Sequence, residues 1–396
     1  MTKKLIVKEG KIMIKKKLLV VLTLSLFIIS YGCSSDKEKT IKVENFDYGK
    51  MKEVELVKRD GKVQKTDDKY KIHNKYFEYA NELTCSQYQI LDDNNSEAKF
   101  FQELNKTDLT IYKANTGKCQ KIHTFQNVGA LSIEGKEFNE VVYINVIIND
   151  DNEQSGLWSV SDLGPRHLSY FFSMASDIEI DKENEAIYTI EHSSDVSFFR
   201  KYTLTGQMVE EHKLGENSPY HKFYLDGTKI KFIYYNEIEE GMIYEYMVDS
   251  YDIETVFEDI DKPAKETVKL TGLEWPYNTF EKSDKYVAFH GVETTVCTIN
   301  FSECFKYDSA MLVGNSDYLL VGHNQQNSDY VFFNLLQLQP LDSSAAFLTK
   351  LGSYDADKLL NSYSFYWKQL VGDKLIIKMA NEKDDESVVI EYTLNE

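Results

Sequence analysis

Short runs of apolar or alternating residues recur along this chain, separated by clusters of Asp, Asn, Gly and Ser. The clearest unit has Ile178 and Ile180 alternating with acids, then the runs 186–190 and 199–204, with Gly206 leading into a fourth run. Alternation with a period of two is typical of half-buried strands, and stretches with the helical period of 3.6 are almost absent. The pattern predicts an all-β protein.

The second strand of this unit recurs at a regular interval. Repeats of about 40–50 residues with four short strands each are typical of β-propellers, because one blade cannot bury both of its faces alone. We therefore expect a β-propeller with seven blades. Six blades is the main alternative, since one spacing is only 32 residues, and two β-sandwich domains is a third. The predicted centres of the second strands, on average 46 residues apart, are Phe100, Tyr143, Tyr188, Phe232, Val287, Leu319 and Ile376.

One blade resembles a known group. The segment 177–214 reads Ile-x-Ile-Asp, then Ile-Tyr, then Arg-Lys-Tyr-x-x-x-Gly, which is similar to a blade of the NHL and TolB-like propellers. The likeness is looser over 99–258 and poor over 259–396. It implies a propeller that presents loops to a partner, and it implies no particular chemistry.

The ring is expected to be closed by a strand from the N-terminal side. The last unit supplies three strands, near 363–370, 375–379 and 388–394, so its outermost strand is missing. The segment 51–63, with an apolar run before the Asp60-Gly61 turn, is placed to fill it. Such pairing removes an exposed sheet edge.

The N-terminal region carries the pattern of a secretory signal. Three lysines, Lys15 to Lys17, precede an apolar run from Leu18 to Ile29 and then Gly32-Cys33. A Cys after a small residue resembles the lipobox of bacterial lipoproteins, in which the Cys is lipidated, although Ser30 stands where Leu is usual. A transmembrane anchor is the alternative, but the run is shorter than the roughly 20 residues that a bilayer requires.

This interpretation divides the chain into three parts. Residues 1–32 are predicted to be the signal peptide, with translation starting at Met13, residues 33–50 a polar flexible tether, and residues 51–396 one propeller domain. Ser34-Ser35 and the short acidic stretch after them favour the outer membrane, at its periplasmic face or at the cell surface. The protein is thus expected to contact a membrane through lipid on Cys33.

Charge excludes one class of partner. The chain carries 45 basic and 64 acidic residues; removal of residues 1–32 takes away seven Lys and one Glu, which leaves 38 against 63, a net charge of −25. Such a surface repels phosphate backbones, so we expect no nucleic acid partner. The 27 Tyr and 22 Phe favour strands and also supply surfaces that stack on ligands.

Apart from Cys33, four cysteines are present, an even number in an oxidising compartment. Cys297 and Cys304 would face each other across a hairpin if Asn300-Phe301 is a two-residue turn, which makes them a candidate disulfide. Cys85 and Cys119 have no such local argument. The alternative is that all four are buried free thiols. Zinc is not expected, since neither a CxxC pair nor clustered His accompanies them.

Candidate binding residues lie at predicted strand ends and innermost strands. Three histidines each end a second strand on one face, where they would share a rim, and the alternative is that each caps its own loop. Aromatic residues near the innermost strands of blades five and seven would stack on a sugar or peptide, unless they pack between blades. The candidate rim is His192, His290, His323, Trp275, Tyr277, Tyr366 and Trp367.

Other chemistry finds little support. The motifs HExxH, GxSxG, GxxxxGK[ST] and GxGxxG are absent, so we expect no cofactor and assign no catalytic residue. The acidic run from Asp177 to Glu183 alternates with Ile and is expected to be a solvated face rather than a calcium site.

Together these features predict a lipid-anchored, non-catalytic propeller that binds an envelope protein or a glycan. The alternative is a propeller hydrolase or lyase acting on polysaccharide, and a scaffold subunit of an envelope complex is a third possibility. A close His–acid pair in a polar centre would favour the enzyme, and a plugged or apolar centre would favour binding.

Overall fold

The chain was analysed as a computed structural model. It describes residues 37–47, 52–53, 57–58, 64–66, 85, 88–92, 95, 98–105, 107–115, 118–129, 135–149, 155–170, 177–192, 196–214, 220, 222–239, 243–273, 279–291, 293–322, 334–337, 347–350, 364–371, 374–381 and 386–394. The predicted signal peptide and Cys33 lie outside these residues.

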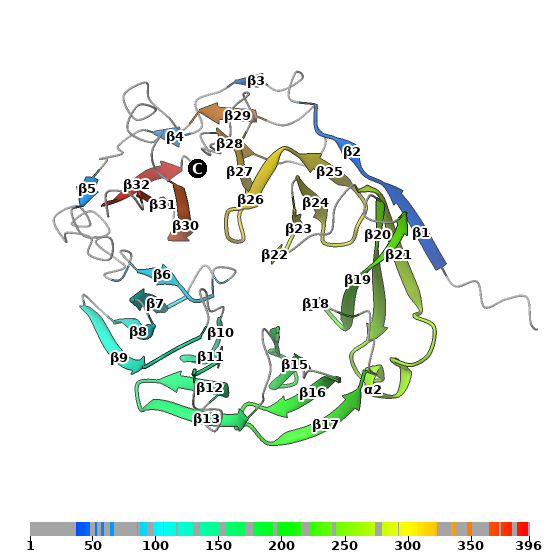
Figure 1. The fold of residues 1–396 in the computed structure, drawn as a ribbon, viewed down its shortest axis with the longest axis horizontal. Helices are drawn as coiled ribbons and strands as arrows, with labels where there is room; N and C mark the ends of the chain where they lie inside the picture. The colour runs from blue at the N-terminus through cyan, green and yellow to red at the C-terminus, as the bar shows by residue number, and fades with distance from the viewer. Residues whose placement is uncertain are drawn as a thin grey trace, which may run out of the picture.

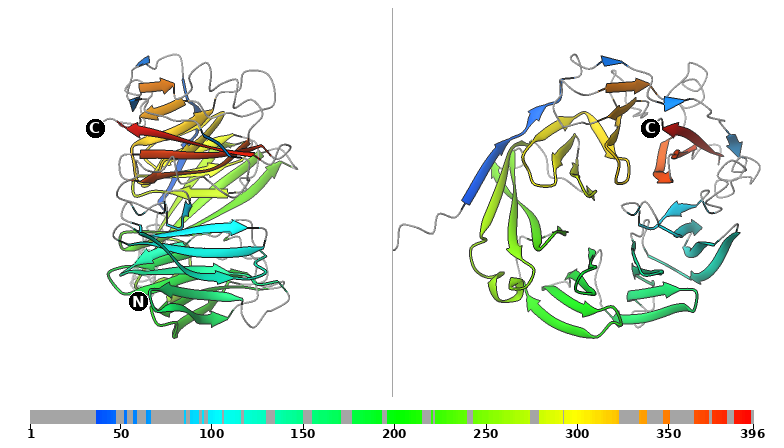
Figure 2. Two further views of the ribbon diagram at one scale, coloured as in Figure 1. Left: turned by 90° about the vertical axis from the view of Figure 1, so that its left-hand side faces the viewer. Right: turned by 180° about the vertical axis from the view of Figure 1, so that it is seen from behind.

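The described strands form seven sheets arranged around a ring, which is the architecture of a β-propeller (Figure 1). We number the sheets as blades 1 to 7 in chain order. Within each blade, consecutive strands pair antiparallel, and the first strand lies nearest the ring axis (Figure 2). The all-β prediction and the propeller prediction are confirmed.

Blades 1 to 3 are four-stranded antiparallel sheets built from consecutive strands. Their strands are β6 (Gln89–Ile90), β7 (Phe100–Asn105), β8 (Asp108–Asn115) and β9 (Lys118–Phe125); β10 (Gly135–Phe138), β11 (Val141–Val146), β12 (Gly156–Ser161) and β13 (Gly164–Tyr170); and β14 (Ile178–Asp181), β15 (Ala186–His192), β16 (Ser197–Thr203) and β17 (Met208–Lys213).

Blades 4 to 7 combine consecutive strands with pieces of the N-terminal region. Their own strands are β18 (Lys222–Asp226), β19 (Lys229–Glu239), β20 (Ile243–Asp252) and β21 (Glu266–Leu273), with the short helix α2 (Val256–Asp259); β22 (Thr279–Lys282), β23 (Tyr286–His290), β24 (Thr294–Thr298) and β25 (Cys304–Tyr307); β26 (Ser309–Leu312), β27 (Tyr318–Gly322), β28 (Asn334–Gln337) and β29 (Phe347–Lys350); and β30 (Ser364–Val371), β31 (Lys374–Asn381) and β32 (Glu386–Leu394).

The N-terminal strands run around the outside of these four blades, and we call them the belt. In parallel pairing, β1 (Lys37–Lys42) lies on β21, β2 (Glu44–Asn45) on β25 and β3 (Lys52–Glu53) on β29. In antiparallel pairing, β4 (Val57–Lys58) and β5 (Gln64–Thr66) lie on β32. The described part of the expected closing segment 51–63 therefore pairs with the last blade, and also with blade 6.

The expectation of a flexible tether over 33–50 is wrong for residues 37–47. Val43 and Phe46 are each only 5% exposed, and they join the cores between blades 4 and 5 and between blades 5 and 6. Except for Ile41, the residues of β1 and β2 are polar, because an edge strand is held by its backbone N–H and C=O groups, which any side chain allows.

The cores lie between neighbouring blades, and the second strands alternate between them. In β11, Val142 and Ile144 pack toward blade 1, whereas Tyr143 packs toward blade 3. In β23, Phe289 packs toward blade 4 and Ala288 toward blade 6. Successive side chains of a strand point to opposite faces, so each blade supplies one face to each neighbour.

Candidate functional site

Charged side chains from several blades meet near the ring axis, around Glu281 of β22. Its Oε1 lies 3.1 Å from Nζ of Lys368 in β30, and its Oε2 accepts the backbone N–H of Leu312 in β26 at 2.8 Å. One carboxylate therefore joins blades 5, 6 and 7. The innermost strand of a blade has an unpaired edge, and Glu281 satisfies one of the edge N–H groups of blade 6.

His290 is the fourth member of this group. It ends β23, and its Nε2 lies 3.5 Å from Oε2 of Glu281, while its Nδ1 lies 3.4 Å from Oγ1 of Thr294. Register pairs Glu281 with Ala288 and Thr279 with His290, so the two side chains are diagonal neighbours on one face of the hairpin. The side chains of His290 and Glu281 are 17% and 27% exposed. We call Glu281, His290 and Lys368 the axial cluster.

The axial cluster holds Glu281 as an anion. Burial alone would raise the pKa of this carboxyl, but the charge of Lys368, the nearby His290 and the N–H of Leu312 outweigh it and lower the pKa to about 2. A general acid needs the opposite shift, toward the working pH. Glu281 is therefore fixed as a charged partner of Lys368 and His290.

A second charged group connects other blades near the axis. Glu179 of β14 lies 3.7 Å from Nζ of Lys136 in β10 and 3.8 Å from Nζ of Lys282 in β22. Nζ of Lys282 also donates to the carbonyl of Leu225 in β18 at 2.8 Å. Charged side chains of blades 2, 3 and 5 thus meet near a backbone carbonyl of blade 4.

Side chains also satisfy edge N–H groups between adjacent blades. Gln369 Oε1 of blade 7 accepts the N–H of Ile90 in blade 1 at 2.7 Å. Asp92 in blade 1 accepts the N–H of Glu137 in blade 2 at 2.8 Å. These two side chains therefore bind backbone N–H groups of the neighbouring blade.

The acidic run from Asp177 to Glu183 is not the solvated face expected from its alternation. Asp177 lies against Nζ of Lys222 at 2.5 Å, and burial raises the pKa of its carboxyl. Asp181 is 8% exposed and accepts the backbone N–H groups of Glu183 and Asn184 at 3.1 Å each. Asp177, Glu179 and Asp181 have partners because the innermost strand faces the axis and a neighbouring blade, whereas Glu183 in the following turn is exposed.

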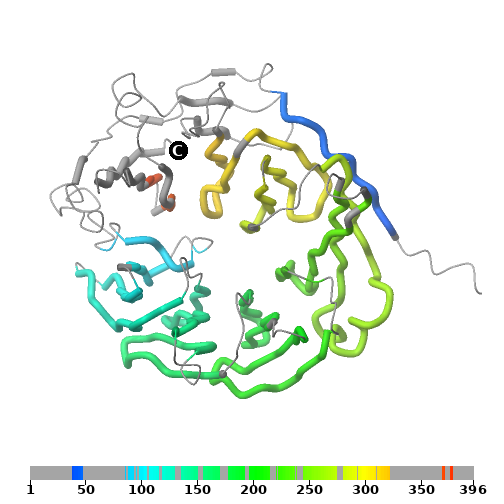
Figure 3. The backbone as a smooth tube through the Cα atoms, viewed as in Figure 1, coloured from blue at the N-terminus to red at the C-terminus, as the bar shows by residue number. Residues whose placement is uncertain are grey.

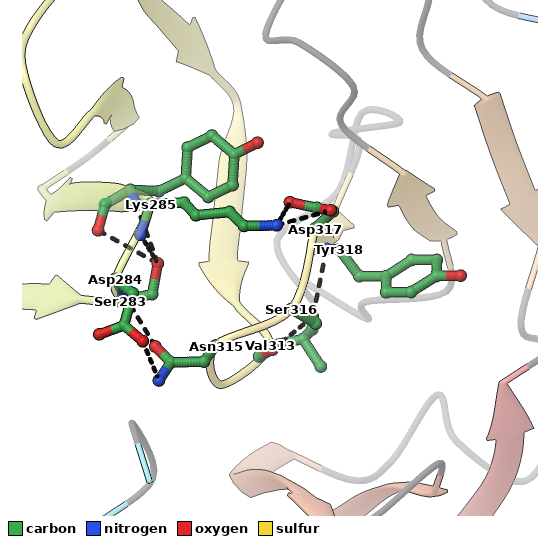
Figure 4. A network of polar contacts seen from close by, with 9 residues as sticks. Ser283, Asp284, Lys285, Val313, Asn315, Ser316, Asp317 and Tyr318 are labelled. Atoms are coloured by element: carbon green, nitrogen blue, oxygen red, sulfur yellow. Dashed lines mark hydrogen bonds and ion pairs between the residues drawn. The ribbon is translucent and has the colours of Figure 1, made fainter. Parts of the chain in front are cut away.

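The turns that join first and second strands lie at the end of the blades away from His290. We call this end the hairpin face, and the end that carries His290 the opposite face. On the hairpin face, turns of blades 5 and 6 are linked, as Figure 4 shows: Lys285 Nζ lies 2.7 and 2.9 Å from the Asp317 carboxylate, and Asp284 and Asn315 exchange two hydrogen bonds of 2.9 Å. These turns are held to each other.

All four cysteines outside the N-terminal region are paired in the structure. Cys297 and Cys304 face each other in the β24–β25 hairpin and form a disulfide, as the candidate pairing predicted. Cys85 and Cys119 form the second disulfide, across 34 residues. The free-thiol alternative is not what the structure contains.

The hairpin turn itself differs from the expected two-residue form. Thr298 and Glu303 are joined by a backbone hydrogen bond of 3.0 Å, which leaves four residues, 299–302, in the turn. Phe301 takes the left-handed φ of 54° and is 1% exposed. A bulky residue rarely adopts this conformation. Burial of its ring beside Phe289 compensates for the strain.

Of the predicted rim, the structure places one side chain at the axis. His290 lies in the axial cluster. The backbone of His192 ends β15, and Tyr366 and Trp367 lie in β30, but these three side chains are not among those described. Trp275, Tyr277 and His323 lie outside the described residues. The structure therefore brings His290 together with two residues that were not predicted, Glu281 and Lys368.

Glu281 and Lys368 carried a weak sequence signal. Each is a single charged residue on a predicted strand, and their meeting depends on β22 and β30 being innermost strands two blades apart. The sequence signal for a site at these residues was a charged residue on a predicted innermost strand. That signal does not identify the residue with which the charge pairs.

Comparisons with known proteins identify no family for this chain. No family model matches, and no curated protein matches. Solved structures that resemble the fold include an oligogalacturonate lyase in complex with manganese, at 8% identity and a TM-score of 0.49, covering 78% of this chain and 89% of that one. The β-propeller domain of the Trilobed protease from Pyrococcus furiosus has 6% identity and a TM-score of 0.46, with coverages of 75% and 91%.

A polysaccharide lyase, Uly1, has 11% identity and a TM-score of 0.44, with coverages of 75% and 88%. Likeness at this level carries no argument about activity.

Within the part of the chain that the structure describes, no group of three or more His, Cys, Asp or Glu is placed to hold a metal ion. The described residues also include no helix with the length and apolar character needed to span a membrane.

Proposed function

We propose that this protein is a lipid-anchored binding propeller of the bacterial envelope, with seven blades closed by the belt. The seven sheets and the pairing of β4 and β5 with β32 support the blade number and the closure. The signal sequence and Cys33 support lipid attachment, with the outer membrane as the proposed site. Kinship with the NHL and TolB-like group belongs to the same proposal and rests on the blade at 177–214.

The observation that carries a non-catalytic role is the state of Glu281. Its carboxylate is paired with Lys368, lies beside His290 and accepts the N–H of Leu312, so it joins three blades, and its pKa of about 2 keeps it ionised throughout the physiological pH range. Glu179 is likewise paired with Lys136 and Lys282. Such groups fix the relative positions of the blades, which favours a rigid platform whose loops contact a partner.

The proposed partner is an envelope protein or a glycan that binds the opposite face. Without residues 1–32 the chain has a net charge of −25, so a neutral or basic partner fits better than a polyanion. The aromatic residues Trp275, Tyr277, Tyr366 and Trp367 are proposed to stack on that partner, with His192 and His323 beside them.

The test is capture of partners from the native envelope by the lipidated protein, with Trp275→Ala and Tyr277→Ala together as the site variant. The matched control is Tyr235→Ala, which removes an aromatic side chain that is 37% exposed on β19. We expect the wild type and the control to retain one stoichiometric protein or glycan and the site variant to lose it. Equal retention by all three proteins, or retention of nothing, would contradict this proposal.

A propeller hydrolase or lyase acting on polysaccharide is the second candidate. The observation that favours it is the His290–Glu281 pair, because a carboxylate that orients a histidine is a common arrangement in general base catalysis. The purified protein would then release new reducing ends or unsaturated sugars from neutral or uronate-containing polysaccharides. His290→Ala would abolish that release, whereas the binding proposal predicts no turnover in either protein.

A further inference from the structure

The first described strand of the chain begins very close in sequence to the proposed lipid. Lys37 is the first residue of β1, and it lies four residues after Cys33. A four-residue span covers at most about 14 Å even when fully extended. The tether expected from the sequence, 18 residues long, would have left the orientation of the propeller free. Because β1 begins at Lys37, the propeller has much less freedom to change its orientation relative to the lipid than an 18-residue tether would allow.

The start of β1 lies at one defined place on the propeller. Lys37 pairs with Glu266, the first residue of β21, in the first of six consecutive residue pairs. Nζ of Lys229, in the turn between β18 and β19, lies 2.9 Å from Oε2 of Glu266. Nζ of Lys39 donates to the carbonyl of Phe301 at 2.8 Å, in the turn after β24. The belt therefore starts at the hairpin face, on the rim of blade 4.

We infer that the lipid on Cys33 holds the hairpin face at blade 4 next to the membrane, so that the opposite face, with His290, points away from it. This inference rests on the proposed lipidation. The parallel pairing directs β1 away from the anchored end, and its six residues span about 20 Å at 3.3 Å per residue. The far end of blade 4 is thus held further from the bilayer than the four-residue link reaches.

The charges on this rim do not form a basic patch that would bind anionic lipid by itself. Lys262 lies 2.7 Å from Asp259, Lys229 lies 2.9 Å from Glu266, and Lys265 is bonded to Asp252. Each of these three lysines has a carboxylate partner, and the described Lys39 side chain of β1 is bonded to the carbonyl of Phe301. Attachment should therefore depend on the acyl chains and should be insensitive to salt, in contrast to a polybasic surface.

The experiment places a fluorophore at one of two positions in the full-length lipidated protein, bound to phosphatidylcholine vesicles that contain a quencher in the bilayer. The membrane-side reporter is Lys262→Cys, in which the native side chain is 62% exposed. The far-side reporter is Ile238→Cys, 51% exposed near the far end of β19 in the same blade. We expect quenching at position 262 to exceed quenching at position 238 at least threefold.

The control lengthens the link. Insertion of twelve Gly and Ser residues between Ser35 and Asp36 should reduce the difference between the two reporters to less than 1.5-fold, because the link no longer limits the approach. Equal quenching at both positions in the wild type, or stronger quenching at position 238, would overturn the inferred orientation.

Flotation with the vesicles separates this result from the lipidation on which it rests. Wild type should float at both low and high salt, and Cys33→Ser should not. If the wild type fails to float, lipid anchoring is wrong and the orientation falls with it. If it floats with equal quenching at both positions, only the orientation is wrong.

Discussion

The outer edges of blades 4 and 5 are built differently from that of blade 3. In blades 4 and 5 the fourth strand is covered by the belt, and Val43 and Phe46 insert into the cores behind it. In blade 3 the fourth strand, β17, is the last strand of its sheet among the described residues, and five of its six residues are exposed. The outermost strand of a blade is thus covered by the belt in blades 4 and 5, and it is the edge of the described sheet in blade 3.

The difference shows two ways of protecting a sheet edge. β17 carries Glu210, Glu211 and Lys213, and charged side chains on an edge discourage pairing with another chain. β21 instead accepts a parallel strand from the same chain, so its edge is removed rather than charged. Covering an edge also lets the belt bury apolar side chains, which adds stability that a charged edge does not provide.

Removing one belt side chain should give the largest effect. Phe46 stacks on Tyr307 with ring centroids 4.7 Å apart and is 5% exposed. We expect Phe46→Ala to lower the free energy of unfolding by about 3–5 kcal/mol, through lost burial and a cavity. The matched change in the uncovered blade, Val209→Ala at a position 50% exposed, should stay within about 0.5 kcal/mol. Urea titration of both variants checks this, and equal midpoints would show that the belt is not packed.

The two disulfides should have the next largest effects on the free energy of unfolding, and the longer loop, in blade 1, should contribute more than the shorter one, in blade 5. Cys85–Cys119 closes 34 residues and fixes β9, the outermost strand of blade 1, whereas Cys297–Cys304 closes seven residues in blade 5. On the loop-entropy account, replacing the first pair by Ala should cost about 4 kcal/mol and the second about 2.5 kcal/mol. Thermal unfolding of the two double variants tests the order, which a larger loss for the short loop would reverse.

The smallest expected effect depends on pH. Glu281→Gln should cost about 1–2 kcal/mol at pH 7, because Lys368 loses its charged partner while the site stays partly exposed. The pKa of Glu281 is lowered to about 2 in the fold, so its contribution is fully present above about pH 5 and is lost as pH falls toward 2.

The control for this prediction is Glu210→Gln, an exposed position on β17. Chemical unfolding at several pH values should show the Glu281→Gln variant converging with the wild type near pH 2, while the control follows the wild type throughout. A constant gap between Glu281→Gln and the wild type across this range would exclude the ion pair as its cause.

Sequence pattern predicted the repeating frame well. The predicted centres Phe100, Tyr188, Val287 and Ile376 each lie in the second strand of a blade, as do the other three. Second strands are flanked by strands on both sides and by blades on both faces, so their apolar character is strong. The short spacing between blades 5 and 6 reflects short strands and turns, because both are separate sheets.

The hydrophobic pattern did not predict contacts between residues far apart in the sequence or contacts made by the backbone. The part of the belt within 37–47 was predicted to be a polar tether because β1 is held by main-chain pairing, and only Ile41, Val43 and Phe46 indicate burial there. The axial cluster was missed because Glu281 and Lys368 are 87 residues apart. Their proximity follows from ring geometry, which single-strand periodicity does not contain.

The most direct test of the account is hydrogen–deuterium exchange of the full-length protein, followed in peptides that cover 37–47, β21 and β17. If the belt is part of the fold, the amides of 37–42 that pair with β21 are protected to the same degree as β21 itself, and more strongly than β17. Exchange of residues 37–47 within seconds, at the rate of an unstructured chain, would show that this segment is a tether and would contradict the belt.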